Sequence, residues 1–211
     1  DVLWVTGQYN DTSWIDPKTN TVIGTTPKME GRVLQYLFLA YGFDSIWVTT
    51  RHDGLDRIDP ATRQVSASIE LGDGTRNDIM NGVLTTAAAV WVVSGDKAEL
   101  IKVDPATNSV VSKTSWTTLI EEAKSQTTVP AGKGTDFIWI SVVGDEGGGG
   151  IPTGLLRIDP KTGAGLTFLP LNSKQVGDIA VGDNAVWVAG TGQINRVNVT
   201  TNRIDATYAT D

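Results

Sequence analysis

The sequence contains no cysteine, only one histidine, and no apolar run of the ~18 residues that a membrane-spanning helix needs. The absence of cysteine excludes disulfides, thiolate metal sites and cysteine nucleophiles. With a single histidine, a Ser-His-Asp triad could use only that residue, and neither Gly-x-Ser-x-Gly nor His-Glu-x-x-His occurs. We therefore predict no membrane span and find no motif of a hydrolase.

The chain also has fewer basic than acidic residues. The 17 Lys and Arg residues are outnumbered by 24 Asp and Glu residues, which gives a formal net charge of −7. Phosphate binding draws most of its affinity from a basic face, so we expect no nucleic-acid partner. The chain is instead rich in valine, threonine, glycine (23 residues) and tryptophan (7 residues). With 211 residues, 40% of them hydrophobic, it is typical of one globular domain of short strands and tight turns.

Two short motifs recur five times in a fixed order. The first is a tryptophan between two aliphatic residues, and successive copies lie 43 to 48 residues apart. These copies are Leu3-Trp4-Val5, Ile46-Trp47-Val48, Val90-Trp91-Val92, Ile138-Trp139-Ile140 and Val186-Trp187-Val188. The second motif follows each tryptophan, as Trp14-Ile15-Asp16-Pro17, Arg57-Ile58-Asp59-Pro60, Lys102-Val103-Asp104-Pro105, Arg157-Ile158-Asp159-Pro160 and Arg196-Val197-Asn198. Repeats of this length indicate an array of similar structural units.

Each repeat is expected to contain four strands. In the last copy they cover residues 178–181, 185–189, 194–199 and 203–208, separated by Gly, Asn and Thr turns. The third and fourth strands are joined by Asp-Pro-x-Thr-Asn or Asp-Pro-x-Thr-Gly. In such a turn, proline fixes its own φ angle, and the aspartate carboxylate accepts a hydrogen bond from the backbone N–H two residues on. Asn or Gly at the last position adopts the left-handed conformation. Arg63 is a weaker residue for that last position.

Four antiparallel strands can bury both faces of their sheet only by stacking on neighbouring sheets. We therefore predict an all-β fold, a β-propeller of four-stranded antiparallel blades with five repeats, in a single domain over residues 1–211. The repeated tryptophans are expected to fill the space between twisted sheets. The blades cover approximately residues 1–31 (a partial blade), 32–76, 77–127, 128–174 and 175–211.

The first blade is predicted to lack its inner strand. Candidate inner strands occur at residues 33–40, 82–87, around 129–133 and 178–181, whereas only Asp1 and Val2 precede the first tryptophan motif. An uncovered inner edge invites pairing with another segment. Two interpretations stay open. Either a second chain or a missing segment completes this blade, as in a fragment of a longer propeller, or the chain is a five-bladed ring with one three-stranded blade.

The runs Ser45-Ile46-Trp47-Val48-Thr49 and Arg57-Ile58-Asp59-Pro60-Ala61-Thr62 resemble the repeats of bacterial YVTN-type and NHL-type β-propellers. That superfamily includes the virginiamycin B (streptogramin) lyases. The resemblance implies an extracellular, periplasmic or envelope-associated protein, in a group of scaffolds, ligand binders and a few enzymes. The streptogramin lyases use more than one histidine together with acidic residues and magnesium. One histidine cannot reproduce that set, so no catalytic residue is carried over.

The connections between second and third strands hold most of the candidate site residues, because they should emerge at the mouth of the propeller channel. Acids in several of these loops could bind Ca²⁺, Mg²⁺ or a cationic ligand, although solvation alone also explains acidic loops. The metal candidates are Asp11, Asp53, Asp96 and Asp145. His52 is the candidate catalytic base, with a solvated loop residue as the alternative. The candidate ligand-binding residues are Tyr9, Arg51, Asp53, Asp96, Glu146 and Trp116.

Trp116 lies just before a predicted short helix. Thr118-Leu119-Ile120-Glu121 fits a capping box, which predicts a helix over residues 118–124. Trp116 could stack on a flat ligand or fill a gap in the packing. The same alternatives apply to Trp14, which stands at a position otherwise held by Arg or Lys.

The sequence favours a non-enzymatic, extracytoplasmic propeller that binds a small-molecule or protein ligand at the channel mouth. The alternative is a metal-assisted lyase or hydrolase of the streptogramin lyase type, which would use His52 and nearby acids on the same face. No motif requires a cofactor, and calcium or magnesium is the candidate.

Overall fold

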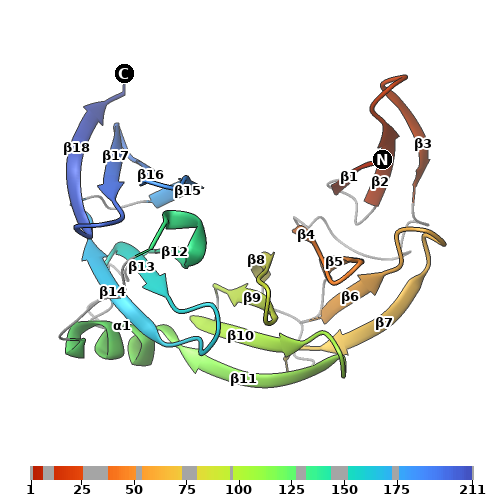
Figure 1. Cartoon of the computed structure of the whole chain (residues 1–211), viewed down its shortest axis with the longest axis horizontal. Coiled ribbons are helices and arrows are strands. Elements are labelled where there is room, and N and C mark those ends of the chain that lie inside the picture. Colours follow the sequence, from red (N-terminus) through yellow and green to blue (C-terminus); the bar gives the residue numbers. More distant parts are fainter. Residues whose placement is uncertain are drawn as a thin grey trace. The chain divides into compact units, whose positions relative to one another are not determined.

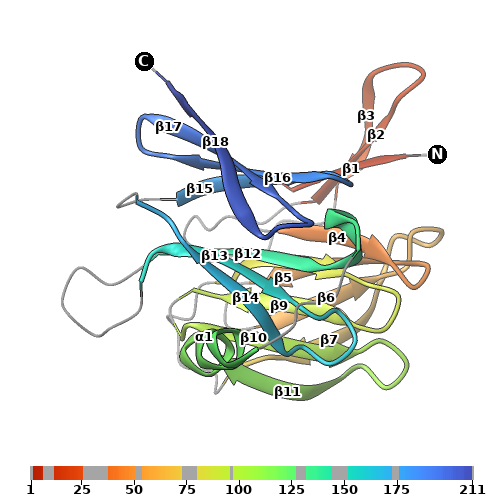
Figure 2. The same cartoon turned by 60° about the vertical axis from the view of Figure 1, so that its left-hand side comes forward.

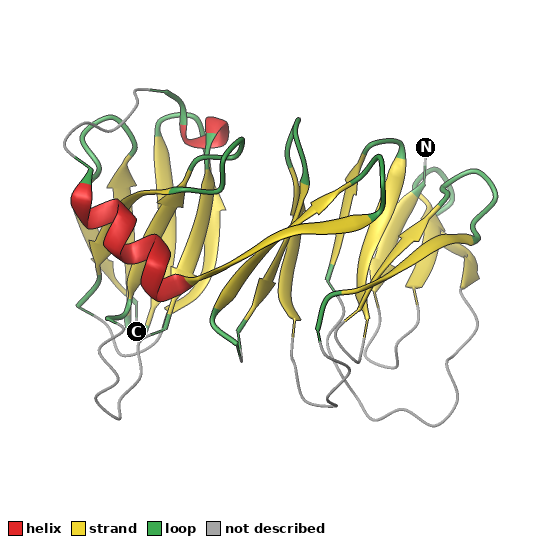
Figure 3. Ribbon diagram, turned by 90° about the horizontal axis from the view of Figure 1, so that it is seen from below, coloured by secondary structure: helices red, strands yellow, loops and turns green. Residues whose placement is uncertain are grey.

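The computed structural model describes residues 2–6, 12–25, 38–50, 54–72, 80–95, 97–126, 132–143, 152–172 and 176–210. Within these ranges the chain forms 18 β-strands, one α-helix and one 3-10 helix (Figures 1 and 3). None of the described helices is long and apolar enough to cross a membrane. The chain divides into two compact units, Asp1–Ser115 and Trp116–Asp211.

The first unit contains three antiparallel sheets, and in each the strands follow one another in chain order. The first sheet consists of β1 (Leu3–Thr6), β2 (Thr12–Asp16) and β3 (Thr21–Thr25). The second consists of β4 (Leu39–Gly42), β5 (Ser45–Thr50), β6 (Gly54–Ile58) and β7 (Val65–Glu70), and the third of β8 (Met80–Thr85), β9 (Val90–Ser94), β10 (Glu99–Asp104) and β11 (Ser109–Ser115). The first sheet thus has the three strands predicted for a blade without its inner strand.

The second unit contains two sheets of the same kind and the helices (Figure 2). The helix α1 (Trp116–Ser125) precedes the 3-10 turn η1 (Gly134–Asp136). One sheet consists of β12 (Ile138–Val142), β13 (Gly154–Ile158) and β14 (Gly165–Pro170), and the other of β15 (Val176–Val181), β16 (Ala185–Gly190), β17 (Gln193–Asn198) and β18 (Arg203–Ala209). Each repeat therefore forms one sheet, as predicted.

The predicted inner strands of the third and fifth blades are β8 and β15, each of which begins two residues before the predicted 82–87 and 178–181, and those of the second and fourth blades differ more. In the second blade the inner strand is β4, so it begins at Leu39, and of the predicted range 33–40 residues 33–37 lie outside the described residues. In the fourth blade the described part of the chain has no strand before β12. Residues 132–133 of the predicted strand are not extended into a ladder but lead into η1, while 129–131 lie outside the described residues.

The turn between the third and fourth strands has the predicted geometry in every blade. The first residue of each turn accepts a hydrogen bond from the backbone N–H two residues on, at 2.7 Å for Asp59 and Asp159 and 2.8 Å for Asp104. The fifth residue has a positive φ in all five turns, namely Asn20, Arg63, Asn108, Gly163 and Asn202. The ladder also shifts register just before each of these turns. This bulge and turn belong to the repeat.

The tryptophans of the second and fourth blades fill the space between sheets. In the first unit, Trp47 and Leu55 form a core cluster with Val90 and Val92 of the next sheet. In the second unit, Trp139 packs with the corresponding valines, Val186 and Val188. In each unit, therefore, a blade presents its tryptophan to the following blade, which presents the two aliphatic residues that flank its own tryptophan. The predicted packing role of these tryptophans is confirmed.

The predicted helix is present and begins earlier than the capping-box pattern indicated. It starts at Trp116, so Thr118 lies within its first turn and is not its cap. Leu119 and Ile120 are buried, and α1 lies along β14 in Figures 1 and 2. Gly165 makes this close approach possible, because a Cβ there would lie 1.9 Å from the Leu119 carbonyl oxygen. The Gly165 N–H donates to Glu122 Oε2 at 3.0 Å.

Candidate functional site

Most of the predicted site residues lie outside the described residues. These are Tyr9, Asp11, Arg51, His52, Asp53, Asp96, Asp145 and Glu146. The strands that flank them are described. They show that the connections holding these residues are equivalent, since each joins the second strand of a blade to the third.

These equivalent connections differ widely in length. Gly190 and Gln193 pair directly, so the connection in the fifth blade is two residues, 191–192. The connection in the fourth blade runs from 143 to 153, eleven residues between β12 and β13. Every blade thus shares its ladder and its turn between the third and fourth strands, but not this connection. Variable loops on a constant framework are where binding residues concentrate in β-proteins.

Trp116 is the one predicted site residue that the structure describes. It is the first residue of α1, and its side chain is buried. Its indole N–H has no hydrogen-bond partner in the described part of the chain. A covered ring offers no face for a ligand, so this geometry favours the packing interpretation of Trp116.

The basic residue before each Asp-Pro turn has a role that the motif alone does not reveal. It lies directly across the ladder from the tryptophan of the same blade, as Trp47 does from Arg57 and Trp139 from Arg157. The cation lies over the indole ring at 5.0 Å for Arg57, and 5.2 Å for Lys102 on Trp91. Such cation–π contacts add to the packing of each blade. The signal in the sequence was the Arg or Lys that recurs in this motif.

Two of these arginines also bind the following blade. Arg57 Nη1 donates to the Pro105 carbonyl oxygen at 2.8 Å and to Asn108 Oδ1 at 3.1 Å. Arg157 Nη1 makes the same two bonds in the second unit, to the Val199 carbonyl oxygen at 3.3 Å and Asn202 Oδ1 at 2.6 Å. The asparagines that close these two turns, Asn108 and Asn202, therefore also accept from the neighbouring blade. Burial lowers the pKa of Arg157 to about 10, so the guanidinium stays charged at neutral pH.

Between the first and second blades, the arginine and the turn asparagine of this contact are replaced by Trp14 and Arg63. Trp14 stands where the other blades carry Arg or Lys, and its ring packs on Trp4 with centroids 5.3 Å apart. Arg63 stands at the turn position of Asn108, and its guanidinium lies 5.0 Å from the centre of the Trp14 ring. The cation that contacts the tryptophan thus comes from the following blade here, whereas in the second blade it comes from the same blade. Trp14 therefore fills the inter-blade space, as one of its two interpretations proposed.

The indole N–H groups of two tryptophans donate to the backbone that precedes the second strand of their blade. Trp47 Nε1 donates to the Gly42 carbonyl oxygen at 3.0 Å, and Trp139 Nε1 to the Gly134 carbonyl oxygen at 3.0 Å. Both acceptors lie five residues before the tryptophan and press against the next blade. A Cβ at Gly42 would lie 2.7 Å from the Thr85 side chain, and one at Gly134 would lie 2.2 Å from the Gly182 carbonyl oxygen. A side chain at either glycine would therefore crowd the next blade.

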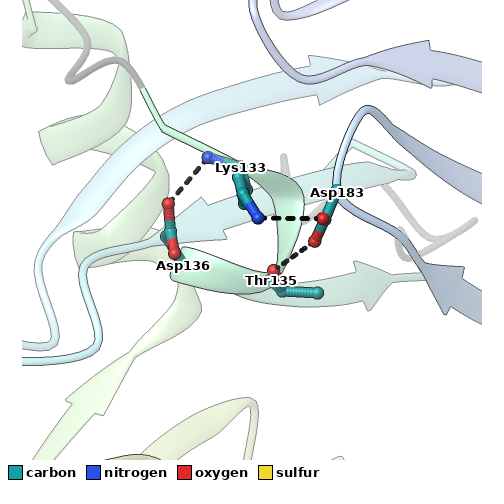
Figure 4. A network of polar contacts seen from close by, with 4 residues as sticks. All are labelled: Lys133, Thr135, Asp136 and Asp183. Carbon is teal, nitrogen blue, oxygen red and sulfur yellow. Dashed lines mark hydrogen bonds and ion pairs between the residues drawn. The ribbon is translucent and has the colours of Figure 1, made fainter.

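A polar network strengthens that contact in the second unit, as Figure 4 shows. Asp183 accepts from Lys133 Nζ at 3.0 Å and from the Thr135 hydroxyl at 2.9 Å. The Lys133 N–H donates to Asp136 Oδ2 at 2.7 Å. The hydrogen bond from Lys133 lowers the pKa of Asp183, and the same bond raises the pKa of Lys133. All of these bonds join η1 to itself or to the β15–β16 turn, so the network fastens two blades together.

Within the described ranges, no three His, Cys, Asp or Glu side chains are grouped so that they could hold a metal ion. The acids predicted to bind a cation all fall in the second-to-third-strand connections and stay predictions.

Comparison with known proteins identifies the fold. No protein family and no curated protein sequence matches this chain, but 821 chains of solved structures are similar to it. Hydrazine synthase of Kuenenia stuttgartiensis aligns with a TM-score of 0.74 at 13% identity, over 100% of this chain and 63% of that one. BamB from Moraxella catarrhalis aligns with a TM-score of 0.64 at 14% identity, over 99% of this chain and 62% of that one. The chain thus spans less than two thirds of the length of either.

These similarities and the sheet topology define the protein as an all-β protein of the β-propeller class with five repeats, whose first blade has three strands in the part of the chain that the structure describes. At such low identity the likeness establishes the fold alone. The narrower resemblance to YVTN-type and NHL-type repeats stays a prediction.

Proposed function

We propose that the protein is a non-enzymatic binding propeller whose second-to-third-strand connections take a cationic group of a small-molecule or protein ligand. One observation carries the proposal. The repeat keeps the same contacts at its Asp-Pro turns, while the connections at the other ends of these strands vary from two to eleven residues. A scaffold that repeats its framework and varies one set of loops is suited to recognition.

The charge of the loops supports a cationic ligand. Four of the five connections carry an acid, at Asp11, Asp53, Asp96 and Asp145, in a chain of net charge −7. The basic residues of the framework do not neutralise these acids, because Arg57 and Arg157 are held between blades. Carboxylates gathered from several loops bind cations of the Ca²⁺ or Mg²⁺ type as well as organic cations. An extracellular or envelope location is part of the proposal and follows from the resemblance to YVTN-type propellers.

Thermal unfolding in the presence of defined cations tests the proposal. Spermine, Ca²⁺ and Mg²⁺ serve as probes, with EDTA as the reference for the metals. We expect spermine to raise the Tm of the wild type and not that of a D11N/D53N/D96N/D145N variant. A D16N/D59N/D104N/D159N variant is the matched control, because it removes the same charge from the Asp-Pro turns, where Asn198 already serves in the fifth blade. Equal spermine shifts in both variants would contradict a loop site.

The enzymatic alternative has its own experiment. Ring opening of virginiamycin B by the wild type, dependent on Mg²⁺ and lost in His52→Ala, would replace the binding proposal with the lyase one. Cell fractionation of the source organism tests the extracytoplasmic location separately.

A further inference from the structure

The sequence contains a single asparagine followed by glycine, Asn81-Gly82, and the structure places it at a β-bulge in β8. Met80 pairs with Ser94 of β9. The next paired residue of β8 is Gly82, opposite Val93, so Asn81 is the extra residue of the bulge. A bulge removes a residue from the regular ladder and redirects its side chain. Asn81 is also exposed, so water reaches its amide.

The side chain of Asn81 is directed at the connection between β9 and β10. The N–H of Gly95, the first residue of that connection, donates to Asn81 Oδ1 at 2.8 Å. Glycine permits this approach, because a Cβ at Gly95 would lie 2.1 Å from the same oxygen. A backbone N–H on an amide oxygen withdraws electrons from the amide carbon and stabilises the negative charge that develops when a nucleophile adds. The Gly95 N–H thus activates the side-chain amide of Asn81.

A nucleophile stands next to this amide in the chain. It is the backbone nitrogen of Gly82, which the covalent structure keeps close to the Asn81 side chain, so that attack is intramolecular. Gly82 has no side chain to hinder the approach. The fold does not itself need glycine there, since φ is not positive and a Cβ would meet only Val93 side-chain atoms at 3.9 Å, an ordinary contact. Alanine at this position therefore tests reactivity without disturbing the packing.

We propose that Asn81 is a site of spontaneous deamidation in the folded protein. Hydroxide removes the proton from the Gly82 nitrogen, which forms a bond to Asn81 Cγ. The bond from Cγ to Nδ2 breaks, and the nitrogen leaves as ammonia after taking a proton from water. The resulting cyclic imide adds water at either carbonyl and opens to an aspartate or an isoaspartate at position 81. The net change is the gain of one water and the loss of one ammonia, with no oxidation or reduction.

Both products change the charge where β8 approaches the third-blade connection. The aspartate keeps an oxygen that can accept from the Gly95 N–H. The isoaspartate adds a methylene group to the backbone at the bulge, where the ladder is already shifted. Either product replaces a neutral amide with a carboxylate, so the reaction adds negative charge beside a connection that also carries Asp96. The effect of this charge on a cationic ligand rests on the proposed function, whereas the reaction does not.

Incubation of the folded wild type in mildly alkaline buffer tests the reaction. Peptide mass spectrometry measures the conversion at each asparagine, and isoaspartyl methyltransferase labels the isoaspartate. We expect Asn81 to convert and Asn108 to keep its amide. Asn108 is the internal control, because its Oδ1 also accepts a hydrogen bond, from Arg57 Nη1 at 3.1 Å, but serine follows it in the sequence.

Two variants separate the nucleophile from the activating donor. Gly82→Ala should convert about tenfold more slowly, because its methyl group hinders the approach of the nitrogen. Gly95→Ala should also be slower, by about tenfold, because its Cβ displaces Asn81 Oδ1 from the N–H. The φ of Gly95 is not positive and the Asn81 side chain is exposed, so this variant should keep the wild-type Tm. In urea, where the contact is absent, Gly95→Ala and the wild type should convert at the same rate.

Two results would overturn the proposal. One is a folded wild type in which Asn81 keeps its amide over a period that converts it in urea. The other is a folded Gly95→Ala variant that converts as fast as the wild type or faster, since the hydrogen bond from Gly95 would then protect Asn81.

The effect on binding is tested separately with Asn81→Asp, which has the charge of the product. We expect spermine to raise the Tm of this variant more than that of the wild type. An equal rise in both would contradict the effect on binding, and no rise in either would contradict the proposed function. Neither result alters the conversion of Asn81, which is measured by mass.

Discussion

Arg57 Nη1 donates to the carbonyl oxygen of Pro105 at 2.8 Å, across 48 residues of sequence. Neither residue belongs to a site. One is the basic residue of a third strand, and the other is the proline of the turn in the following blade. Arg157 makes the same contact with Val199 in the other unit, so the bond recurs in two of the repeats. Removing either arginine should therefore lower the free energy of unfolding.

Arg157→Ala should destabilise the protein by about 3 kcal/mol. Arg157 is fully buried, and its loss leaves the Val199 carbonyl and Asn202 without their donor and opens a void beside Trp139. Arg196→Ala is the matched control, because it removes the same side chain from the exposed blade face and should cost less than ~1 kcal/mol. Urea unfolding measures both, and equal losses would contradict the inter-blade role of Arg157.

The glycines five residues before the tryptophans should differ in their tolerance of alanine. Gly134→Ala places a Cβ 2.2 Å from a backbone oxygen and should cost ~2–3 kcal/mol. Gly42→Ala places a Cβ 2.7 Å from Thr85 Cβ, which moves only with the β8 backbone, and should cost ~1–2 kcal/mol. Gly182→Ala meets no neighbouring blade and should stay within ~0.5 kcal/mol of the wild type. Chemical denaturation of the three variants should reproduce this order.

The exchanged pair Trp14 and Arg63 should show coupling. Trp14→Arg places two guanidinium groups together at the junction of the first two blades, since Arg63 already lies 5.0 Å from that ring. Arg63→Asn removes the cation from Trp14. The double variant rebuilds the Arg–Asn pair of the second and third blades, Arg57 with Asn108. In a double-mutant cycle we expect the double variant to recover at least ~1 kcal/mol relative to the sum of the single changes. Additive losses would refute the equivalence of these positions.

Acid should loosen the Asp-Pro turns. Hydrogen bonds from the Thr62 and Ala61 backbone lower the pKa of Asp59, and those from Ala106 and Thr107 lower the pKa of Asp104. A lowered folded-state pKa means that their stabilisation is complete above the ordinary value of 3.8 and is lost as the pH falls through the lower value. The Tm of the wild type should therefore drop more between pH 5 and about pH 2.5 than that of an Asp59→Asn/Asp104→Asn variant. Parallel curves for the two proteins would show that these carboxyl groups do not contribute.

Local patterns made most of the fold predictable. The Asp-Pro turns form as expected because their hydrogen bonds join residues two or three apart, so the information lies within five residues. Tryptophan between two aliphatic residues predicted burial on both faces of a strand, since side chains alternate along it. The prediction of an inner strand in the fourth blade was wrong for its described residues, 132–133. These residues lead into η1, which is held by Asp183, about 50 residues away. No local pattern contains that contact.

The sequence by itself determined the repeat, the strand meander within each sheet and the turn that closes it, because these depend on side-chain alternation and short-range hydrogen bonds. Only the tertiary structure decided what the recurring basic residue does. It also decided why Trp14 and Arg63 depart from the pattern together, and which glycines admit a neighbouring blade. Those properties arise where residues more than 40 positions apart meet, and there packing geometry sets the partner of each side chain.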